Sequence, residues 1–374
     1  MKFYSYNEFK LFEAVNLSNA PLIGIIAVRK IGTQYNRYFE QEKYFRKLVK
    51  IGQQNSLNVC VFSHNDLNED FSKINRASFL INDKWVDMET KLPAVIYNRS
   101  KVTPLSFLTK LENAGVKLFT EVNVIKLAND KLKSQKFLVS KGIKMPIADI
   151  YSSNNLLKML NYNESCILKP IFGSQGAGII YIKYNAPGYT LKYEDKEISI
   201  SDNELENKVN DIILKYYKLD PAKYLIQQYI NLQKYNDSVF DIRVLMQKDG
   251  DNNIKRTGMG VRIGGANRIT ANLHTGGNKL ELSVLLKELF NEDLDGPISN
   301  TIRNTSEKIC KEIEKEIGSL GELALDYLIG ETGNIYLIEI NARPGRTLFE
   351  IMPEIHEKSI ERPILYMKYL VKHL

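Results

Sequence analysis

The chain has 374 residues, of which 44% are hydrophobic and 25% charged, and its formal net charge is +7. This length can hold two or three domains, the composition is that of a globular protein, and the basic residues are too dispersed to predict nucleic-acid binding. Residues 1–16 lack the features of a signal peptide, and no apolar run is long enough to span a membrane. Cys60, Cys166 and Cys310 lie far apart in apolar contexts, which predicts buried free thiols in a cytoplasmic protein.

The first third of the chain alternates apolar strands with a helical segment. Strands are predicted at residues 21–28, 57–62, 77–81, 85–88 and 93–97, and a helix at about 37–54. This alternation is typical of a small open α/β sheet with mostly parallel strands. Ligands of such sheets bind beyond the carboxyl ends of strands, so Arg29, Asn98 and Arg99 are candidate binding residues. For each arginine the alternative is a solvated surface position.

The middle of the chain places two lysines near a glycine-rich loop. Asn129 or Asp130 is the expected N-cap of a helix that starts at Lys131. A strand at 166–170 contains Lys169 and precedes the sequence Gly173-Ser-Gln-Gly-Ala-Gly178. Such a loop can place backbone N–H groups on phosphate oxygens, although a plain turn is the alternative. A Walker P-loop is excluded, because the Gly-Lys-Ser/Thr sequence and a following helix are missing.

Residues of about 165–230 have the size of a compact lid. The pattern is strand, loop, strand, charged hairpin, helix at 202–218, and a last strand at 224–230. The last strand crosses between subdomains, where backbone groups could meet the edge of an adenine ring. A simple linker strand is the alternative interpretation.

The C-terminal part contains two apolar runs, 323–329 and 335–340, whose short Gly-Glu-Thr-Gly-Asn connection predicts a β-hairpin. Asp326 then falls almost opposite Glu339, and Asn341 shares a face with Glu339. Three oxygen-bearing side chains on one face suit Mg²⁺, which also takes waters and phosphates. The alternative is a hairpin with polar residues on a wet face. Helices are predicted at 299–317, with Ile302, Ile309, Ile313 and Ile317 toward the core, and at 347–352 and 355–374.

Several motifs follow one another in a specific order. They are Asn129-Asp-Lys131, Lys169-Pro-x-x-Gly-Ser-x-Gly-x-Gly178, Gln227-Gln-Tyr-Ile230, Phe240-Asp-Ile-Arg243 and Asp326…Glu339-x-Asn341. In this order they resemble the ATP-grasp superfamily. Arg262 followed by Asn272-Leu-His274-x-Gly-Gly277 resembles the glutathione-synthetase and ribosomal-protein glutamate-ligase branch. Ile23-Gly-Ile-Ile26 and Leu92-Pro-Ala-Val-Ile-Tyr-Asn-Arg99 are similar to the spore-coat-associated YheC/YheD group.

The resemblance implies an α/β (α+β) ATP-grasp fold. It places an N-terminal pre-ATP-grasp domain at 1–121 and an ATP-grasp domain at 122–374, with the lid at about 165–230. It also implies ATP as cofactor, with one or two Mg²⁺ ions, or Mn²⁺ instead. The partners would be a carboxylate-bearing small molecule or peptide and a nucleophile, without nucleic acid or membrane, and a homodimer is one option. The expected location is the cytoplasm, and the resemblance to the YheC/YheD group adds the spore coat as a second option.

The resemblance also implies a role for each motif. The phosphates of ATP would be held by Lys131, Lys169 and the loop residues Gly173, Ser174, Gln175, Gly176 and Gly178. Gln228, Tyr229 and Ile230 would meet adenine through the backbone, with Gln227 near its amino group and Asp241 also in the nucleotide site. Asp326, Glu339 and Asn341 would hold the metal. Catalytic roles fall to Arg262 and Arg243 on the transferring phosphoryl group and to Asn272 on metal and substrate.

The implied reaction also follows from chemistry. Joining a carboxylate to an amine in water is uphill, so ATP must first convert the carboxylate to an acyl phosphate, a step that needs charge stabilisation. The sequence supplies cations and metal ligands for that step and no serine or cysteine triad of comparable specificity. Two alternatives stay open, a phosphotransferase that stops at a phosphorylated acceptor and a non-catalytic ATP-binding coat or scaffold protein. The sequence Arg343-Pro-Gly-Arg346 does not identify the acid.

Overall fold

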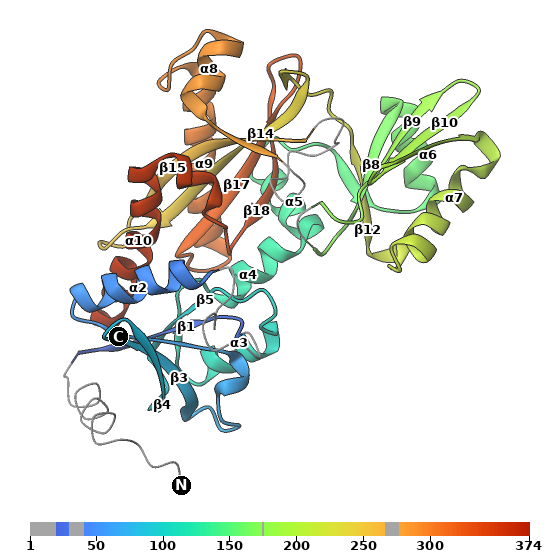
Figure 1. Ribbon diagram of the computed structural model, residues 1–374. Coiled ribbons are helices and arrows are strands. Elements are labelled where there is room, and N and C mark those ends of the chain that lie inside the picture. Colours follow the sequence, from blue (N-terminus) through green and yellow to red (C-terminus); the bar gives the residue numbers. More distant parts are fainter. Residues whose placement is uncertain (1–19, 30–40, 174–175, 266–276) are drawn as a thin grey trace.

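The computed structural model describes residues 20–29, 41–173, 176–265 and 277–374. Its strands form three sheets that follow one another along the chain, and helices pack on each of them (Figure 1). In Figure 1 the first sheet lies at the bottom, the third sheet above it, and the middle sheet to the right. This mixed architecture confirms the predicted α/β class. No helix within the described ranges is long and apolar enough to cross a membrane.

The N-terminal sheet has the strand order β4-β3-β2-β1-β5-β6. Its strands are β1 Leu22–Ile26, β2 Asn58–Phe62, β3 Lys73–Ile81, β4 Lys84–Lys91, β5 Val95–Asn98 and β6 Lys117–Leu118. Strands β2, β1, β5 and β6 pair in parallel as predicted, whereas β3 pairs antiparallel with β2, and the edge strand β4 pairs antiparallel with β3. Asn82 and Asp83, both at positive φ, form the two-residue turn between β3 and β4. Such a short link can join only antiparallel strands.

Two helices from opposite ends of the sequence cover one face of this sheet. They are α2 (Glu42–Gln54), which is the described part of the helix expected at 37–54, and α10 (Pro353–Lys372). Phe45 and Leu48 of α2 and Ile364 of α10 belong to one buried cluster with Ile23 and Ile25 of β1. Because successive strand side chains alternate between faces, Ile26 of β1 belongs to a different cluster. Helix α3 (Leu105–Asn113) follows the sheet strand β5.

The middle sheet is antiparallel, with the order β11-β10-β9-β8-β12-β7. Its strands are β7 Ala148–Ile150, β8 Ser165–Pro170, β9 Ile180–Asn185, β10 Gly188–Tyr193, β11 Lys196–Ser201 and β12 Tyr224–Gln228. Helix α6 (Ser153–Asn163) packs on β8 and β12. The helix expected at 202–218 consists of a 3₁₀ turn at Asp202–Glu204, α7 at Leu205–Asp211 and a π-helical turn at Ile212–Tyr216. Strand β7 has no counterpart in the sequence-based assignment.

The third sheet has the order β16-β15-β14-β17-β18, and β13 pairs with β14. Its strands are β13 Lys234–Tyr235, β14 Ser238–Lys248, β15 Ile254–Ile263, β16 Asn278–Glu281, β17 Glu322–Ile329 and β18 Ile335–Asn341. Strands β17 and β18 are the predicted hairpin, in which Asp326 pairs directly with Glu339. One residue, Ile338, is extra on β18 because Leu337 already pairs with Tyr327, which makes a β-bulge.

The two faces of the third sheet differ in chemistry. Helices α8 (Leu282–Phe290) and α9 (Pro297–Glu316) pack on the apolar face, where Ile302, Ile309 and Ile313 of α9 are buried as predicted. The opposite face is covered in part by the 3₁₀ helix Thr347–Ile351 and by α10. This second face carries the polar side chains of β14 and β17, and it forms one wall of the site described below.

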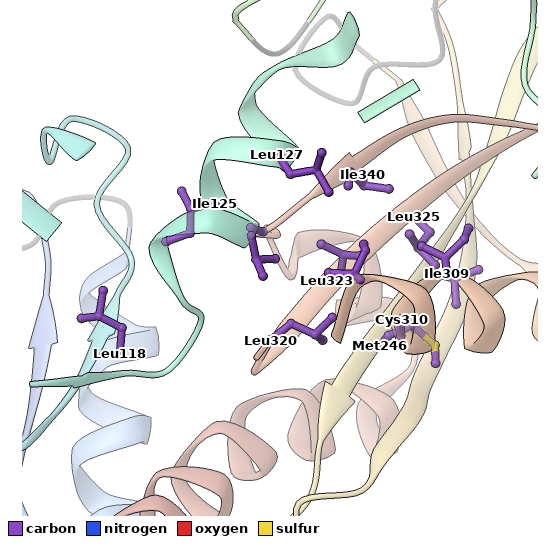
Figure 2. Close-up of a cluster of buried hydrophobic side chains, with 14 of the residues drawn as sticks. Leu118, Ile125, Leu127, Met246, Ile309, Cys310, Leu320, Leu323, Leu325 and Ile340 are labelled. Atoms are coloured by element: carbon purple, nitrogen blue, oxygen red, sulfur yellow. The ribbon is translucent and has the colours of Figure 1, made fainter. Parts of the chain in front are cut away.

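One large apolar core joins the first sheet to the third. Helices α4 (Val122–Asn129) and α5 (Lys131–Ser140) connect the first sheet to the middle one. Figure 2 shows Leu118 of β6 and Ile125 of α4 in the same buried cluster as Leu323, Ile340 and Ile309. Cys60, Cys166 and Cys310 are free and buried, which confirms their prediction, and burial raises the pKa of each thiol.

Candidate active site

A cavity of about 1120 Å³ brings most of the predicted site residues together. Its wall includes Lys131, Lys169, Gly173, Gly176, Gln227, Gln228, Tyr229, Ile230, Asp241, Arg243, Arg262, Asp326, Glu339 and Asn341. These residues come from three parts of the chain, which are the start of α5, the middle sheet and the third sheet. Ligand pockets commonly have about 300–1,000 Å³. The cavity can therefore hold a nucleotide and part of a second ligand.

A few predicted residues lie elsewhere. Ser174, Gln175, Asn272 and His274 are outside the described residues. Arg29 does not line the cavity, because its guanidinium donates to the Asp66 carboxylate at 3.1 Å and to the Arg76 carbonyl at 3.0 Å. The expectation of a binding role for Arg29 is not supported by this placement. Arg99 does line the cavity, as expected for a residue beyond a strand end.

The two lysines approach the cavity from different elements. Asp130 is the N-cap of α5, with its carboxylate accepting from the Lys133 amide at 2.9 Å, and this places Lys131 on the first turn. The Lys131 ammonium donates to the carbonyls of Gly173 at 2.7 Å and Pro170 at 3.3 Å. Lys169 lies on β8 opposite Leu225 and is only 7% exposed. The Lys131 ammonium therefore contacts the start of the glycine loop, and Lys169 lies on the strand that precedes this loop.

The pKa of Lys169 reflects its lack of a partner. Burial lowers it to about 8, Glu339 opposes this shift, and Lys131 adds to it. No described residue forms a hydrogen bond or an ion pair with this ammonium group. Burial also lowers the pKa of Lys131, with Glu339 and Asp130 opposing. A buried cation without a counter-ion is stabilised by a bound anion, so these lysines suit a phosphate chain.

The described glycines of the loop have positive φ angles, but they do not have the same surroundings. Gly173, Gly176 and Gly178 have φ of 123°, 75° and 79°. A Cβ on Gly178 would lie 2.8 Å from Pro170 and 2.8 Å from the Tyr224 hydroxyl, whereas one on Gly173 would meet nothing within 4 Å. Gly178 is absent from the cavity wall. Its position is therefore explained by packing, while Gly173 lines the cavity and has open space for a ligand beside it.

The segment at the end of β12 offers open backbone groups. The Gln228 amide already donates to the Ile147 carbonyl at 2.8 Å, and its side chain donates to Asn163 at 3.1 Å. Tyr229 and Ile230 lie beyond the strand, and no backbone hydrogen bond joins either of them to a described residue. Of the residues predicted to meet adenine, these two therefore have free backbone donors and acceptors.

Apolar residues flank this segment and were not predicted. Ile167, Leu232, Leu328 and Ile338 all line the cavity. They provide flat apolar walls of the kind that a purine ring fills. Ile167 could have been found from the sequence, because it is two residues before Lys169 on the same strand face. Ile338 could not, because it reaches the cavity through the β-bulge.

Paired acids and arginines cross the polar face of the third sheet. Arg262 on β15 forms two hydrogen bonds of 2.6 Å to Asp241 on β14. Arg243 on β14 binds both oxygens of Asp326 on β17, at 2.8 and 2.7 Å, and Arg262 reaches Asp326 at 2.8 Å. Burial alone would raise the pKa of Asp326, but Arg243 and Arg262 outweigh it and lower that pKa. Burial raises the pKa of Asp241 despite the pairing with Arg262.

The oxygens open to a metal are fewer than the sequence suggests. Both oxygens of Asp326 accept from arginines, whereas the Glu339 carboxylate has no hydrogen bond or ion pair with any described residue. The Asn341 side-chain oxygen accepts once, from the Arg343 amide at 2.9 Å. The described residues contain no group of three acids, histidines or cysteines that could hold a metal ion. Two hard oxygen ligands still fit Mg²⁺, which often binds few side chains along with water and phosphates.

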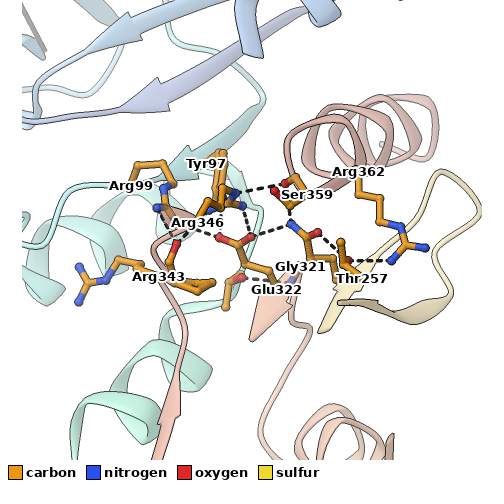
Figure 3. A network of polar contacts seen from close by, with 12 residues as sticks. Tyr97, Arg99, Thr257, Gly321, Glu322, Arg343, Arg346, Ser359 and Arg362 are labelled. Carbon is orange, nitrogen blue, oxygen red and sulfur yellow. Dashed lines mark hydrogen bonds and ion pairs between the residues drawn. The ribbon is translucent and has the colours of Figure 1, made fainter. Parts of the chain in front are cut away.

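A second polar network lies on the same face, at the start of β17, and was missed by the sequence reasoning (Figure 3). Glu322 on β17 is fully buried and binds Arg99 at 2.9 Å, Arg346 at 2.5 Å and Gln247 at 3.0 Å. The Tyr97 hydroxyl donates to Glu322 at 2.5 Å. The network therefore joins β5 of the first sheet to the third sheet. Its signal in the sequence is the spacing from Glu322 to Asp326, which puts both acids on one strand face.

Known proteins share this fold. A family model described as YheC/D like ATP-grasp matches residues 130–370, which is more than half of the chain. The structure of an ADP complex of purK, an N5-carboxyaminoimidazole ribonucleotide synthetase, superposes with a TM-score of 0.58 at 12% identity, covering 92% of this chain and 78% of that one. The fold is thus that of the ATP-grasp class.

Two curated relatives come from Bacillus subtilis (strain 168). The chain is 23% identical to the endospore coat-associated protein YheD over 351 residues, which cover 90% of this chain and 75% of YheD. It is 27% identical to the endospore coat-associated protein YheC over 215 residues, which cover 56% of this chain and 58% of YheC. The match thus spans less than two thirds of YheC. The chain belongs to the YheC/D-like ATP-grasp family.

Proposed function

We propose that the protein is an ATP-dependent ligase that joins a carboxylate to an amine or another nucleophile. The observation that carries this proposal is the convergence of Lys131, Lys169 and the Glu339–Asn341 edge on one cavity. That set combines cations for phosphates with oxygen ligands for a metal ion. The purK relative in fold, whose structure holds ADP, is named as a synthetase, which supports the same class of reaction.

In the proposed reaction, an oxygen of the bound carboxylate attacks the γ-phosphorus of ATP. The bond from that phosphorus to the bridging oxygen breaks, ADP leaves, and an acyl phosphate forms. The nucleophile then attacks the acyl carbon, and inorganic phosphate leaves with the electron pair of the broken C–O bond. The balance needs no other reactant than ATP, the acid and the nucleophile.

Each group on the cavity wall has a role in this scheme. Lys131 and Lys169 bind phosphate oxygens, and the backbone of Tyr229 and Ile230 binds the adenine edge. Arg243 and Arg262 lie beside the transferring phosphoryl group, held in orientation by Asp241 and Asp326. Asn272, with its position outside the described residues, keeps its proposed role at metal and substrate.

Glu339 and Asn341 would hold one or two Mg²⁺ ions, or Mn²⁺, with Asp326 next to them. When bound, such a cation neutralises charge on the phosphates. Asp326 can add a ligand oxygen only if an arginine releases it. We therefore assign Asp326 first to the orientation of Arg243 and Arg262 and second to the metal.

Release of ADP, followed by mass spectrometry of the products, tests the proposal. With the right acid and nucleophile we expect ADP, phosphate and an amide or related condensed product. A stable phosphoester would instead establish the phosphotransferase alternative. Glu339→Gln should lower turnover at least about 100-fold, because it removes a charged metal ligand. Glu331→Gln, in the exposed turn of the same hairpin, is the matched control and should retain activity.

Glu339→Gln is a cleaner test than Asp326→Asn. Glu339 has no partner among the described residues, whereas Asp326 compensates two arginines, so Asp326→Asn also disturbs the packing of the sheet. Full activity of Glu339→Gln would overturn the metal assignment.

The names of YheC and YheD support a second candidate, a coat-associated protein that keeps the ATP fold without turnover. Calorimetry with Mg-ATP separates the two. Binding with ADP release supports the ligase, and a failure to bind Mg-ATP supports the coat protein. A fluorescent fusion followed through sporulation would test the spore coat against the cytoplasm as its location.

A further inference from the structure

Positive charge on the cavity wall exceeds the negative charge that compensates it. Five cations line the cavity and form no ion pair with any described residue: Lys43, Lys101, Lys131, Lys169 and Arg343. Glu339 raises the pKa of each of the three lysines Lys101, Lys131 and Lys169, and it has no partner of its own among the described residues. Lys131 and Lys169 are assigned to ATP. Lys43, Lys101 and Arg343 remain without an assigned ligand. Lys43 is on α2, whereas Arg343 contacts Ser100, the residue before Lys101.

We propose that Lys101 and Arg343 bind a second anionic group on the acid substrate, so that the acid is a small dianion rather than a monocarboxylate. This inference rests on the proposed ligase function and adds the class of its substrate. The second group is a carboxylate or a phosphate, since both have the charge and the acceptor oxygens that lysine and arginine bind.

The structure places these two side chains next to each other although they are far apart in sequence. Lys101 follows β5, and Arg343 follows β18. One guanidinium nitrogen of Arg343 donates to the Ser100 carbonyl at 2.6 Å, and the other donates to Asn129 at 3.2 Å. Arg343 therefore lies between the segment that carries Lys101 and the start of α5, where Lys131 is located.

The position of Arg343 in the chain also places this pair next to the proposed metal site. The Arg343 amide donates to the Asn341 side chain at 2.9 Å, so Arg343 adjoins the edge proposed to hold the metal. An acid with one carboxylate at that edge would present a second anionic group to Lys101 and Arg343. Both residues are thus placed as specificity-determining residues and not as part of the phosphoryl transfer.

The other arginines of the wall are already compensated. Arg243 and Arg262 share Asp326 and Asp241, and Arg99 and Arg346 share Glu322. Lys101 is in a positive field, although its side chain is partly exposed to solvent: partial burial lowers its pKa, Arg343, Arg99 and Arg243 lower it further, and Glu339 opposes them. The Nε atom of Arg99 is also buried without a partner in the described chain. A bound anion would relieve this repulsion.

The competing explanation is that Lys101 and Arg343 serve the triphosphate of ATP. Binding experiments without turnover separate the two explanations. The probes are two pairs of acids, each comparing an acid with two anionic groups to a related acid with one. The pairs are succinate with butyrate and 3-phosphoglycerate with glycerate. Isothermal titration calorimetry would measure each of them, and Mg-ATP separately, on the full chain. Succinate and 3-phosphoglycerate are both called dianions because each has two anionic groups, although the phosphate brings the net charge of 3-phosphoglycerate to about −3. The two probes distinguish a carboxylate from a phosphate as the second group.

We expect at least one dianion to bind about tenfold or more tightly than its monoanionic partner. Lys101→Met should remove that preference and leave the affinity for Mg-ATP unchanged, because one charge-assisted contact accounts for about a tenfold change. Lys101 has no hydrogen-bond or ion-pair partner in the described part of the chain, so this variant should fold. Lys47→Met is the matched control, since Lys47 also lines the cavity but already pairs with Glu357 at 2.6 Å. It should keep the preference.

Three results would overturn the proposal. One is comparable affinity for dianions and monoanions, including no binding by either. Another is a Lys101→Met variant that loses affinity for Mg-ATP instead of the acid. The third is turnover with a monocarboxylate as the best substrate, which would leave the ligase function standing. Conversely, the protein could bind a dianion through Lys101 and yet release no ADP. This result would support the anion site and count against the ligase function.

Discussion

Lys131 and Lys169 show how surroundings differentiate two residues of one type in the same cavity. The Lys131 ammonium donates to two carbonyl groups, whereas the Lys169 ammonium has no acceptor among the residues described. Lys169 is also more completely removed from solvent, and its pKa is lowered to about 8. An arriving phosphate would therefore change the electrostatic free energy of Lys169 more than that of Lys131.

This difference predicts a pH dependence of nucleotide binding. Below about pH 8 the Lys169 ammonium is charged, and above it the amine is neutral, so affinity for Mg-ATP should fall as the pH rises through this value. Lys169→Met should bind at least about tenfold more weakly at neutral pH and show no such fall. Calorimetry across this range is the measurement. A fall of equal size in Lys169→Met would assign the titration to another group.

The same pKa shift has the opposite effect on the stability of the protein without nucleotide, because this stability rises with pH where the affinity for nucleotide falls. The pKa of Lys169 is lower in the folded chain than the value of about 10.4 for a solvated lysine. Between the two values the unfolded chain binds more protons, so the contribution of Lys169 to stability rises with pH there.

Single residues were predicted from the sequence where a local motif marked them. Lys169 was found because it precedes a proline and a glycine-rich loop. Lys101 and Arg343 were not found as a pair, since only the packing of β5 against the end of β18 brings them together. Local patterns contain no information on such a contact.

The elements of the third sheet followed simple periodicities. The register of the hairpin β17–β18 was predicted because both strands are marked by apolar runs and the turn has only a few residues. The bulge at Ile338 was not, because its extra residue leaves the apolar pattern of the strand unchanged. Alternation along β14 and β17 puts Asp241, Arg243, Glu322 and Asp326 on the polar face. Glu322 escaped notice because it directly follows Gly321 at the strand start.

The glycine loop offers a test of packing against backbone conformation. Gly178 and Gly333 both have φ of 79°, but an added Cβ would meet Pro170 and Tyr224 at the first position and nothing within 4 Å at the second. Gly333→Ala should therefore cost only the backbone term of about 1–2 kcal/mol. Gly178→Ala should cost about 1–3 kcal/mol more, because the close contacts force neighbouring groups to shift.

Denaturant unfolding of the two variants would measure the difference in the free energy of unfolding. Equal losses would show that Pro170 and Tyr224 move away at little cost. In that case the packing explanation for Gly178 would be wrong, and a role in the phosphate loop would regain support.

At the scale of the whole molecule, the buried network around Glu322 connects the first sheet to the third. Glu322 accepts from Tyr97 and Arg99, which belong to or follow β5, and from Arg346, which follows β18. Glu322→Ala would leave two buried guanidinium groups without their counter-ion. We expect a loss of about 3–5 kcal/mol in the free energy of unfolding.

Glu357→Ala is the matched control for this prediction. Glu357 of α10 pairs with Lys47 of α2, so it also links distant parts of the chain, but both side chains are exposed. Its loss should cost about 0–1 kcal/mol. Chemical denaturation of both variants is the measurement, and similar losses for the two would contradict the importance assigned to the buried network.

The class of the fold could be predicted from the sequence, and most of the predicted site residues line one cavity, whereas the way the parts pack could not be predicted. Strand and helix patterns, with the order of the motifs, were sufficient for the α/β class. The docking of α10 on the first sheet left no local signal, because an amphipathic helix can cover any apolar face. We propose the boundary at residues 121 and 122, next to α4, although the core continues across it.

The docking of α10 also sets the order in which the core can close while the protein is being made. Phe45, Leu48 and Val49 of α2 share their buried cluster with α10, whose residues are synthesised after all three sheets. At about 5–20 residues per second, the ribosome needs tens of seconds to pass from α2 to α10. For that time the apolar face of the first sheet, and the side of α2 that packs on α10, lack the part of their cover that α10 provides. We therefore expect a nascent chain to need a chaperone most in the period after α2 and before α10 has been synthesised.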